Sequence, residues 1–239
     1  MNFKEYYKNK QVVNSYDLVR RRGLKGDILR NLELKFVDFL IGNEKKNQKI
    51  LEIGIGTGFI SKLLVKKGKF YGIDISKEMI NKAKINLEGQ KYVKLMQGDI
   101  LNLKIKENFD KIVSIRVISH LKEKEAEIAL KKISSILKKG GYFIFNIENL
   151  SFMKRIARKI MRWGSTPNYQ YTFKKIKKLI SKNNLKIDKI IYLDHTFILP
   201  LHFINKIMNN KLSSFIIQKE FQLRNIKFMS TNSFIRCKK

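Results

Sequence analysis

Two acidic side chains, Asp74 and Asp99, stand where successive apolar segments end. The segments, residues 69–75 and 92–96, are typical of strands. An acid at the tip of the second strand of an open α/β sheet can accept two hydrogen bonds from a ribose diol. Either acid alone is equally well explained as a loop or capping residue. Two acids at successive strand ends, beside the glycine-rich turn described next, predict a nucleoside-binding corner.

The glycine-rich turn comprises Gly54, Gly56 and Gly58 and follows the apolar run 50–53, with Glu52 two residues before the first glycine. Glycine has no Cβ, so its backbone can adopt φ > 0 and lie directly against a ligand. The spacing matches neither the dinucleotide fingerprint nor the phosphate loop. The turn therefore indicates a strand-turn-helix unit, and a tight turn with no ligand remains the alternative.

Short apolar strands alternate with amphipathic helices along the rest of the chain. Expected strands are 50–53, 69–75, 92–96, 111–117, 142–147, 186–193 and 227–237, and expected helices are 27–40, 59–64, 76–87, 123–138 and 171–181. This alternation predicts an α/β protein with a doubly wound parallel sheet and ligands at the carboxyl ends of its strands.

Three parts of the chain follow from these elements. Residues 1–48 form a helical N-terminal extension, in which Asp27 caps a helix that ends at Gly42. Residues 49–149 form the ligand-binding core, and residues 150–239 supply a substrate cap and the closing strands. The polar segment 15–23 is expected to cover the ligand corner as a lid, with a solvated basic helix as the alternative.

Composition limits the classes of protein further. The 239 residues include 51 Lys and Arg against 20 Asp and Glu, a net charge of +31. The excess reflects either compositional drift or a surface that attracts phosphate groups on RNA or anionic lipid. Cys237 is the single cysteine, so one chain can form neither a disulfide framework nor a cysteine-based zinc site, and no metal is expected. The N-terminus lacks the apolar core of a signal peptide, and no apolar run is long enough to span a membrane. We expect a cytoplasmic protein, with the membrane surface as a second location.

The ordered set of motifs resembles the class I S-adenosylmethionine-dependent methyltransferases, in particular the broad small-molecule group that includes ubiquinone/menaquinone-type enzymes. The resemblance covers residues 48–149. It rests on Glu52-x-Gly54-x-Gly56-x-Gly58, Gly72-Ile73-Asp74-Ile75-Ser76 with Met79, Gly98-Asp99-Ile100, Phe109-Asp110-x-Ile112-Val113, Arg116-Val117, His120-Leu121 and Leu137-Lys138-x-Gly140-Gly141. It implies a Rossmann-like, mostly parallel sheet of seven strands that ends in an antiparallel hairpin.

The resemblance also implies roles for individual residues toward S-adenosylmethionine. The glycine turn, Gly54 to Gly58, would lie against the methionine and ribose portions, and Glu52 would brace that turn or approach the methionine amino group. Asp74 would accept hydrogen bonds from the ribose hydroxyls. The adenine would be flanked by Ile75, Met79 and Ile100 and would meet Asp99 through its amino group. Carboxylates suit a ligand that carries a sulfonium, an ammonium and donor hydroxyls, whereas a phosphate would favour cations and backbone N–H groups.

The loop after the fourth expected strand carries two further candidates. His120 is the candidate base for a hydroxyl acceptor, because the pKa of histidine lies near neutrality; the alternative is a histidine that lies near the cofactor without catalysing. Arg116 is predicted to lie at the cofactor site, where it binds an acidic group or anchors the loop. The loop lacks the Asn/Asp-Pro-Pro-Tyr/Phe tetrad of amino-methylating DNA enzymes, and Cys237 is badly placed for a cytosine-C5 nucleophile.

The C-terminal segment holds more than half of the net charge, with 20 Lys and Arg against three acids in residues 151–239. Residues 152–163 alternate apolar and basic positions at helical spacing. Such a helix can lie on an anionic membrane, cover a substrate, or simply pack on the domain. The apolar stretch 197–223 is a candidate wall for an acceptor.

Together these observations predict methyl transfer from S-adenosylmethionine to a small, apolar or lipid-like acceptor. A tRNA-modifying methyltransferase is the alternative that the charge favours, and a non-catalytic cofactor-binding protein is the third hypothesis. Neither the acceptor nor the oligomeric state follows from the sequence.

Overall fold

The computed structural model describes residues 6–20, 23–42, 47–148, 171–193 and 232–239. The segments at 152–163 and 197–223, assigned above to a basic helix and an acceptor wall, lie outside the described residues. The strands are β1 (Lys49–Ile53), β2 (Lys69–Asp74), β3 (Val93–Gln97), β4 (Phe109–Ser114), β5 (Leu137–Glu148), β6 (Lys186–Leu193) and β7 (Asn232–Lys238). The helices are α2 (Lys10–Arg20), α3 (Gly23–Ile41), α4 (Ser61–Leu64), α5 (Lys77–Asn86), α6 (Glu123–Ile136) and α8 (Phe173–Lys182), with 3₁₀ turns η1 (Ile100–Asn102) and η2 (Ile118–His120).

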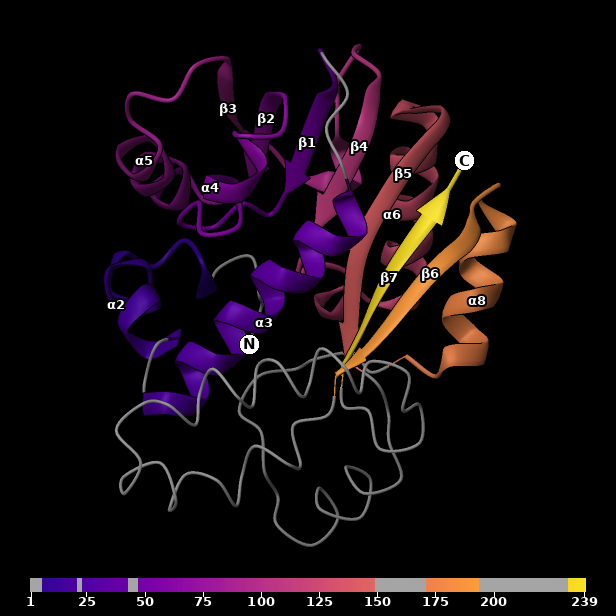
Figure 1. Cartoon of the computed structure of the whole chain (residues 1–239), viewed down its shortest axis with the longest axis horizontal. Helices are drawn as coiled ribbons and strands as arrows, with labels where there is room; N and C mark the ends of the chain where they lie inside the picture. The colour runs from indigo at the N-terminus through magenta and orange to yellow at the C-terminus, as the bar shows by residue number, and fades with distance from the viewer. Residues whose placement is uncertain (1–5, 21–22, 43–46, 149–170, 194–231) are drawn as a thin grey trace, which may run out of the picture.

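The seven strands form one sheet in the order β3-β2-β1-β4-β5-β7-β6 (Figure 1). Strands β1 to β5 run parallel, whereas β7 is antiparallel to both of its neighbours, β5 and β6. The order reverses at β1, so the carboxyl ends of β1 and β4 border a crevice in which α/β proteins bind ligands. The prediction of a doubly wound, mostly parallel sheet that closes with an antiparallel hairpin is confirmed.

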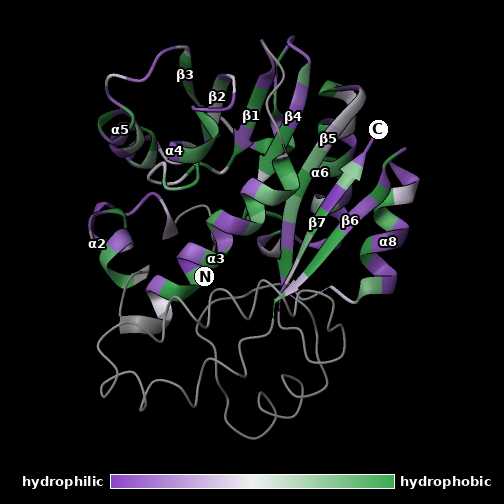
Figure 2. Ribbon diagram, viewed as in Figure 1, coloured by the Kyte–Doolittle hydropathy of each residue, from purple (hydrophilic) through white to green (hydrophobic). Residues whose placement is uncertain are grey.

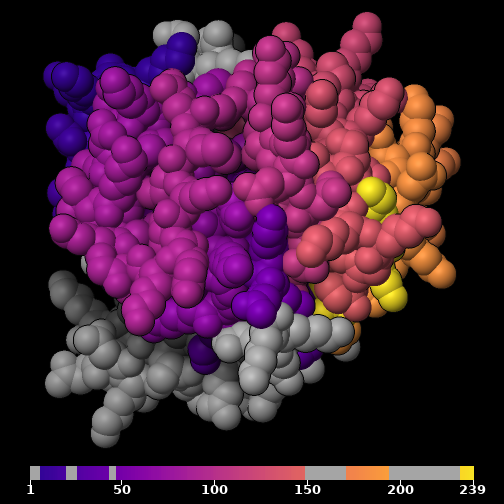
Figure 3. All heavy atoms as spheres, turned by 90° about the horizontal axis from the view of Figure 1, so that it is seen from above, coloured from indigo at the N-terminus to yellow at the C-terminus, as the bar shows by residue number. Residues whose placement is uncertain are grey.

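Alternate side chains of each strand enter the cores on opposite faces of the sheet. Leu51 and Ile53 of β1 pack into the core beneath α6 and α8, whereas Ile50 packs into the core beneath α3 and α4. The middle of the sheet is accordingly mainly hydrophobic in Figure 2, whereas α8 shows both hydrophilic and hydrophobic residues along its length. Seen from above, the orange α8 and β6 lie on one side of the molecule and the indigo N-terminal residues on the other (Figure 3).

Several element boundaries differ from those expected from the sequence. Strand β4 ends at Ser114, not residue 117, because Arg116 adopts a left-handed conformation with φ of 62°. Helix α6 ends at Ile136, and β5 begins immediately at Leu137, which pairs with Phe109 before the register shifts. Helix α3 begins at Gly23, so Asp27 lies inside it and does not cap it. Strand β7 is described from Asn232, and residues 227–231 of the expected strand lie outside the described residues.

Candidate active site

A cavity of about 680 Å³ lies at the carboxyl ends of the parallel strands. Most of the residues predicted for the site line it together, although they come from four different strand ends: Gly54, Gly56, Asp74, Ile75, Met79, Asp99, Ile100, Arg116 and His120. Glu52 and Gly58 are not among the lining residues. A cavity of this volume is of the size that holds a nucleoside-type cofactor.

The glycine turn brings backbone to the edge of the cavity. Gly54 has φ of 76°, and a Cβ there would lie 2.3 Å from Cγ2 of Val117. Gly56 has φ of 54°, and its N–H donates to Oδ2 of Asp74 over 2.8 Å. A side chain at Gly54 would therefore suffer both backbone strain and a steric clash. The turn therefore places the backbone of Gly54 and Gly56 at the cavity, and its approach to a ligand stays a prediction.

The carboxylate residue Asp74 lines the cavity and is only 8% exposed. Its two carboxylate oxygens accept hydrogen bonds from backbone N–H groups, Oδ2 from Gly56 and Oδ1 from Ser76 at 2.9 Å. Burial raises the pKa of Asp74, and these backbone hydrogen bonds oppose that shift. A carboxylate has about four acceptor positions, so two such bonds leave it able to accept further hydrogen bonds from hydroxyl groups.

The residues after β2 and β3 form the rest of this wall. Ser76 caps α5 by accepting from the Met79 N–H at 3.2 Å, which places the buried Met79 at the cavity. Asp99 caps η1 by accepting from the Leu101 N–H at 3.0 Å, which places Ile100 beside it. Apolar side chains next to a carboxylate suit a planar heterocycle that carries an exocyclic amino group.

Glu52 and Gly58 lie behind the wall. The Glu52 side chain is buried and lies 2.6 Å from the Ser61 hydroxyl, measured between Oε2 and Oγ, so it ties β1 to α4. Burial raises the pKa of Glu52 to about 8, and the negative charge of Asp74 adds to the effect. Gly58 packs against Ala83 of α5. Of the two roles that the resemblance implied for Glu52, this geometry fits the brace.

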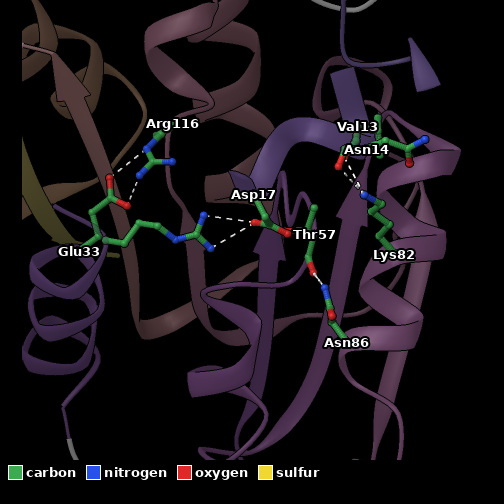
Figure 4. Close-up of polar contacts among 9 residues, drawn as sticks. Val13, Asn14, Asp17, Glu33, Thr57, Lys82, Asn86 and Arg116 are labelled. Carbon is green, nitrogen blue, oxygen red and sulfur yellow. Dashed lines mark hydrogen bonds and ion pairs between the residues drawn. The ribbon is translucent and has the colours of Figure 1, made fainter. Parts of the chain in front are cut away.

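Arg116 lies at the cavity, but its guanidinium group is directed to α3. Nε of Arg116 donates to Oε1 of Glu33 at 2.9 Å, and Nη2 pairs with the other carboxylate oxygen (Figure 4). The backbone N–H of Arg116 donates to Oδ1 of Asn146 over 2.6 Å. Arg116 therefore anchors its loop to α3 and β5, which is one of the two roles considered for it.

Helix α2 and the residues before it form a second wall of the cavity. The sequence predicted a lid at residues 15–23 but not the side chains that form this wall. The rings of Tyr7 and Tyr16 line the cavity. Asp17 of α2 accepts hydrogen bonds from Thr57 of the glycine turn at 3.0 Å and from Arg30 of α3 at 3.2 Å. Lys82 of α5 donates to the carbonyl of Val13 at 2.9 Å, and Figure 4 draws Asp17, Thr57, Lys82 and Val13 as sticks. These bonds hold α2 over the glycine turn.

His120 is the last residue of η2 and lines the cavity. Its ring centroid is 6.2 Å from that of Tyr7. His120 also lines a second cavity, as do Tyr7, Tyr16 and Arg116. The imidazole thus lies at the border between two cavities, which is a suitable place for a group that exchanges a proton with a bound molecule.

Two kinds of feature were not found in the part of the chain that the structure describes. No cluster of three or more His, Cys, Asp or Glu side chains there could hold a metal ion. No helix among the described residues combines the length and apolarity needed to cross a membrane.

The fold and the site together define an α/β protein with a mostly parallel sheet and a cavity, lined by two carboxylates, at the carboxyl ends of its strands. A family model described as a methyltransferase domain matches residues 44–198. The match covers more than half of the chain, and the chain belongs to this methyltransferase family.

Curated relatives support the assignment over part of their length. An uncharacterized methyltransferase of Anoxybacillus flavithermus is 38% identical over 120 residues, which are 49% of this chain and 54% of the relative. An uncharacterized methyltransferase of Bacillus mycoides is 37% identical over 97 residues, 40% of this chain and 45% of the relative. The chain spans about half the length of these curated relatives.

Solved structures share the fold at low sequence identity. An S-adenosylmethionine-dependent methyltransferase of Clostridium acetobutylicum matches with a TM-score of 0.67 and 16% identity, covering 94% of this chain and 98% of the other. Magnesium protoporphyrin IX methyltransferase of Synechocystis, crystallised with bound S-adenosylmethionine, matches with a TM-score of 0.64 and 17% identity, covering 100% and 98%. The class predicted from the sequence is confirmed, whereas no comparison singles out the quinone-type group.

Proposed function

We propose that this protein transfers a methyl group from S-adenosylmethionine to a small acceptor. One observation carries the proposal: Asp74 and Asp99 line one cavity with the backbone of Gly54 and Gly56. When bound, the cofactor supplies an electrophilic methyl group on a positively charged sulfur. The carboxylates and apolar side chains of this wall match the hydroxyl, amino and ring portions of that molecule.

The chain's own residues would act chiefly by positioning. Asp74 would accept the ribose hydroxyls, Asp99 the adenine amino group, and the glycine turn would lie against the remainder. Fixing two reactants in line can supply several kcal/mol of the barrier to transfer. Helix α2, held over the turn by Asp17, would exclude water from the reacting groups.

His120 is proposed as the base that accepts the proton of the acceptor. It lies between the two cavities, where donor and acceptor would meet. Replacement His120→Asn is expected to lower turnover about 10²-fold or more while leaving cofactor affinity unchanged. The remaining turnover of the variant should also no longer fall as the pH is lowered. A variant whose pH profile matches that of the wild type would show that His120 has only a structural role.

The acceptor class is the finer part of the proposal. The prediction of an apolar or lipid-like acceptor rests on residues 152–163 and 197–223, which lie outside the described residues. The tRNA alternative rests on the net charge of +31, and no geometry of the described site favours it. A cytoplasmic location is part of the proposal.

The test is methyl transfer from labelled S-adenosylmethionine to fractionated small metabolites, lipids and tRNA of the host. The proposal expects label in the small-metabolite or lipid fraction. Label confined to tRNA, with activity that falls steeply as salt rises, would instead support the RNA alternative. A protein that binds the cofactor and labels no fraction would support the non-catalytic hypothesis.

A further inference from the structure

A second cavity of about 500 Å³ adjoins the cofactor cavity. It lies between the N-terminal helices and the ends of β5, β6 and β7, and the two cavities share Tyr7, Tyr16, Arg116 and His120. A volume of this size suits a small organic molecule. A molecule bound there would lie next to the cofactor site, across the border that His120 occupies.

The amide of Asn146, in β5, lines the second cavity and has hydrogen-bond donors to spare. The side chain is only 3% exposed, and its Oδ1 accepts the backbone N–H of Arg116 at 2.6 Å. Because a backbone N–H must meet the oxygen, this bond fixes which way the amide group is turned. Nδ2 of Asn146 carries two N–H donors, and neither bonds to a residue that the structure describes. A ligand with an acceptor atom would satisfy a donor that is costly to leave unpaired when buried.

Ser119 of η2 adds a second donor to the same lining. It is buried to the same extent as Asn146, and its hydroxyl has no hydrogen-bond partner within the described part of the chain. Both residues line the second cavity and neither lines the cofactor cavity. The N–H and O–H donors therefore serve a molecule other than the cofactor. A carbonyl oxygen suits them, because it has two lone pairs and can accept both hydrogen bonds.

The formal charges of the described lining cancel. The lining holds two arginines, Arg30 and Arg116, and two glutamates, Glu33 and Glu148. Arg116 pairs with Glu33 (Figure 4), and Arg30 pairs with Asp17. Each arginine thus already has a carboxylate partner, and an anionic ligand would have to compete with that partner. The described lining accordingly favours an uncharged ligand over an anion.

Aromatic side chains supply another part of the lining. Tyr6, Tyr7 and Tyr16 are half-buried, and each is part of the cavity wall. The ring centroids of Tyr6 and Tyr7 are 5.1 Å apart, those of Tyr7 and Tyr16 are 6.1 Å apart, and both pairs are edge-to-face. Aromatic rings favour this arrangement, so a further planar ring can pack against the same side chains.

We propose that the second cavity is the acceptor site and that it takes an uncharged aromatic molecule whose carbonyl oxygen accepts hydrogen bonds from Asn146 and Ser119. The inference rests on the proposed methyl transfer, because it identifies the molecule that lies beside the methyl donor. The two donors recognise the carbonyl group, and the tyrosine rings recognise the planar ring. A site of this kind rejects an analogue that lacks the oxygen, because both buried donors would then stay unpaired.

The test compares three probes of nearly equal size on the full chain saturated with S-adenosylhomocysteine. Acetophenone carries the carbonyl oxygen, α-methylstyrene has a CH₂ group in place of that oxygen, and benzoate carries a negative charge. Dissociation constants are measured by ligand-observed NMR. We expect acetophenone to bind about tenfold more tightly than α-methylstyrene and more tightly than benzoate. Equal binding of acetophenone and α-methylstyrene, or tighter binding of benzoate than of acetophenone, would overturn the inference.

Two variants locate the effect. Ser119→Ala should weaken binding of acetophenone about fivefold and leave binding of α-methylstyrene and of S-adenosylhomocysteine unchanged. Asn146→Asp keeps an oxygen for the Arg116 N–H and removes both Nδ2 donors, so it should also reduce the preference for acetophenone. The matched control is Ser135→Ala, since the Ser135 hydroxyl bonds the carbonyl of Lys132 on the exposed face of α6; it should change no constant.

The outcomes separate this inference from the proposed function. A preference for acetophenone that survives both Ser119→Ala and Asn146→Asp would overturn the assignment of these donors. Retained binding of S-adenosylhomocysteine shows that each variant is folded. Failure of S-adenosylhomocysteine to bind the wild-type chain would refute the proposed function, whereas its binding without a carbonyl preference would refute only this inference.

Discussion

Replacement of Glu52 by glutamine tests whether the carboxyl group beneath the glycine turn is neutral in the folded protein. Burial raises the pKa of Glu52 from the ordinary value of 4.5 to about 8. The folded state therefore favours the protonated acid. Its contribution to stability is fully present below about pH 4.5 and is lost as the pH rises through about 8.

The size of the effect follows from the pKa displacement. Each pKa unit corresponds to about 1.4 kcal/mol, so the full loss is roughly 4–5 kcal/mol. The amide of the Glu52→Gln variant cannot ionise, but its carbonyl can still accept from the Ser61 hydroxyl. The free energy of unfolding of Glu52→Gln minus that of the wild type should therefore be roughly 3 kcal/mol larger at pH 8 than at pH 5. Other groups titrate alike in both proteins and cancel in the difference.

Urea unfolding followed by circular dichroism at pH 5, 6, 7 and 8 would measure this difference, with equal m-values as the check that both proteins unfold alike. Glu107→Gln is the matched control, because the hydrogen bond from Lys49 lowers the pKa of Glu107. The stabilising contribution of Glu107 is present above the unfolded pKa of about 4.5 and is lost only in stronger acid, so the difference between Glu107→Gln and the wild type should stay nearly constant from pH 5 to pH 8. A Glu52→Gln difference that does not change with pH would show that Glu52 is ionised in the folded protein and would refute the reasoning.

Two further variants test the geometry of the cavity. Gly54→Ala should destabilise the fold by roughly 2–4 kcal/mol, because residue 54 has a left-handed φ and an added Cβ would contact Val117, and it should also weaken cofactor binding. The double variant Gly54→Ala/Val117→Ala should recover only the part of this loss that comes from the steric contact. Full recovery of stability in the double variant would contradict the assigned backbone strain. Asp17→Asn should speed amide exchange of residues 10–20 by about tenfold, because it weakens contacts to Thr57 and Arg30. Asp38→Asn, which removes an acid on the same pair of helices, should leave that exchange unchanged, and equal exchange in both variants would show that Asp17 does not hold α2 in place.

The sheet and one wall of the site could be predicted because their signals are local. Apolar runs ending in Gly54, Asp74 and Asp99 mark strand ends, and the carboxyl ends of parallel strands meet at one edge. For Glu52 the sequence left two roles open, and the choice between them depends on the tertiary contact of its side chain with Ser61 behind the wall.

The other wall depends on contacts between residues far apart in the chain. Arg116 pairs with Glu33 across 83 residues, and Thr57 bonds Asp17 across 40. No periodicity or capping pattern links such partners, so the sequence suggested a lid at 15–23 without indicating what holds it. The left-handed conformation of Arg116, which ends β4 early, is likewise fixed by tertiary bonds to Glu33 and Asn146 and not by residue type.

The most direct test of the central claim is a calorimetric titration of S-adenosylmethionine into the wild-type chain, Asp74→Ala and the control Asp38→Asn. We predict one cofactor bound per chain with a micromolar-range dissociation constant. Asp74→Ala should bind at least about tenfold more weakly, and the control should match the wild type. A folded wild-type chain that binds no cofactor, or an Asp74→Ala variant that binds it with unchanged affinity, would contradict the account.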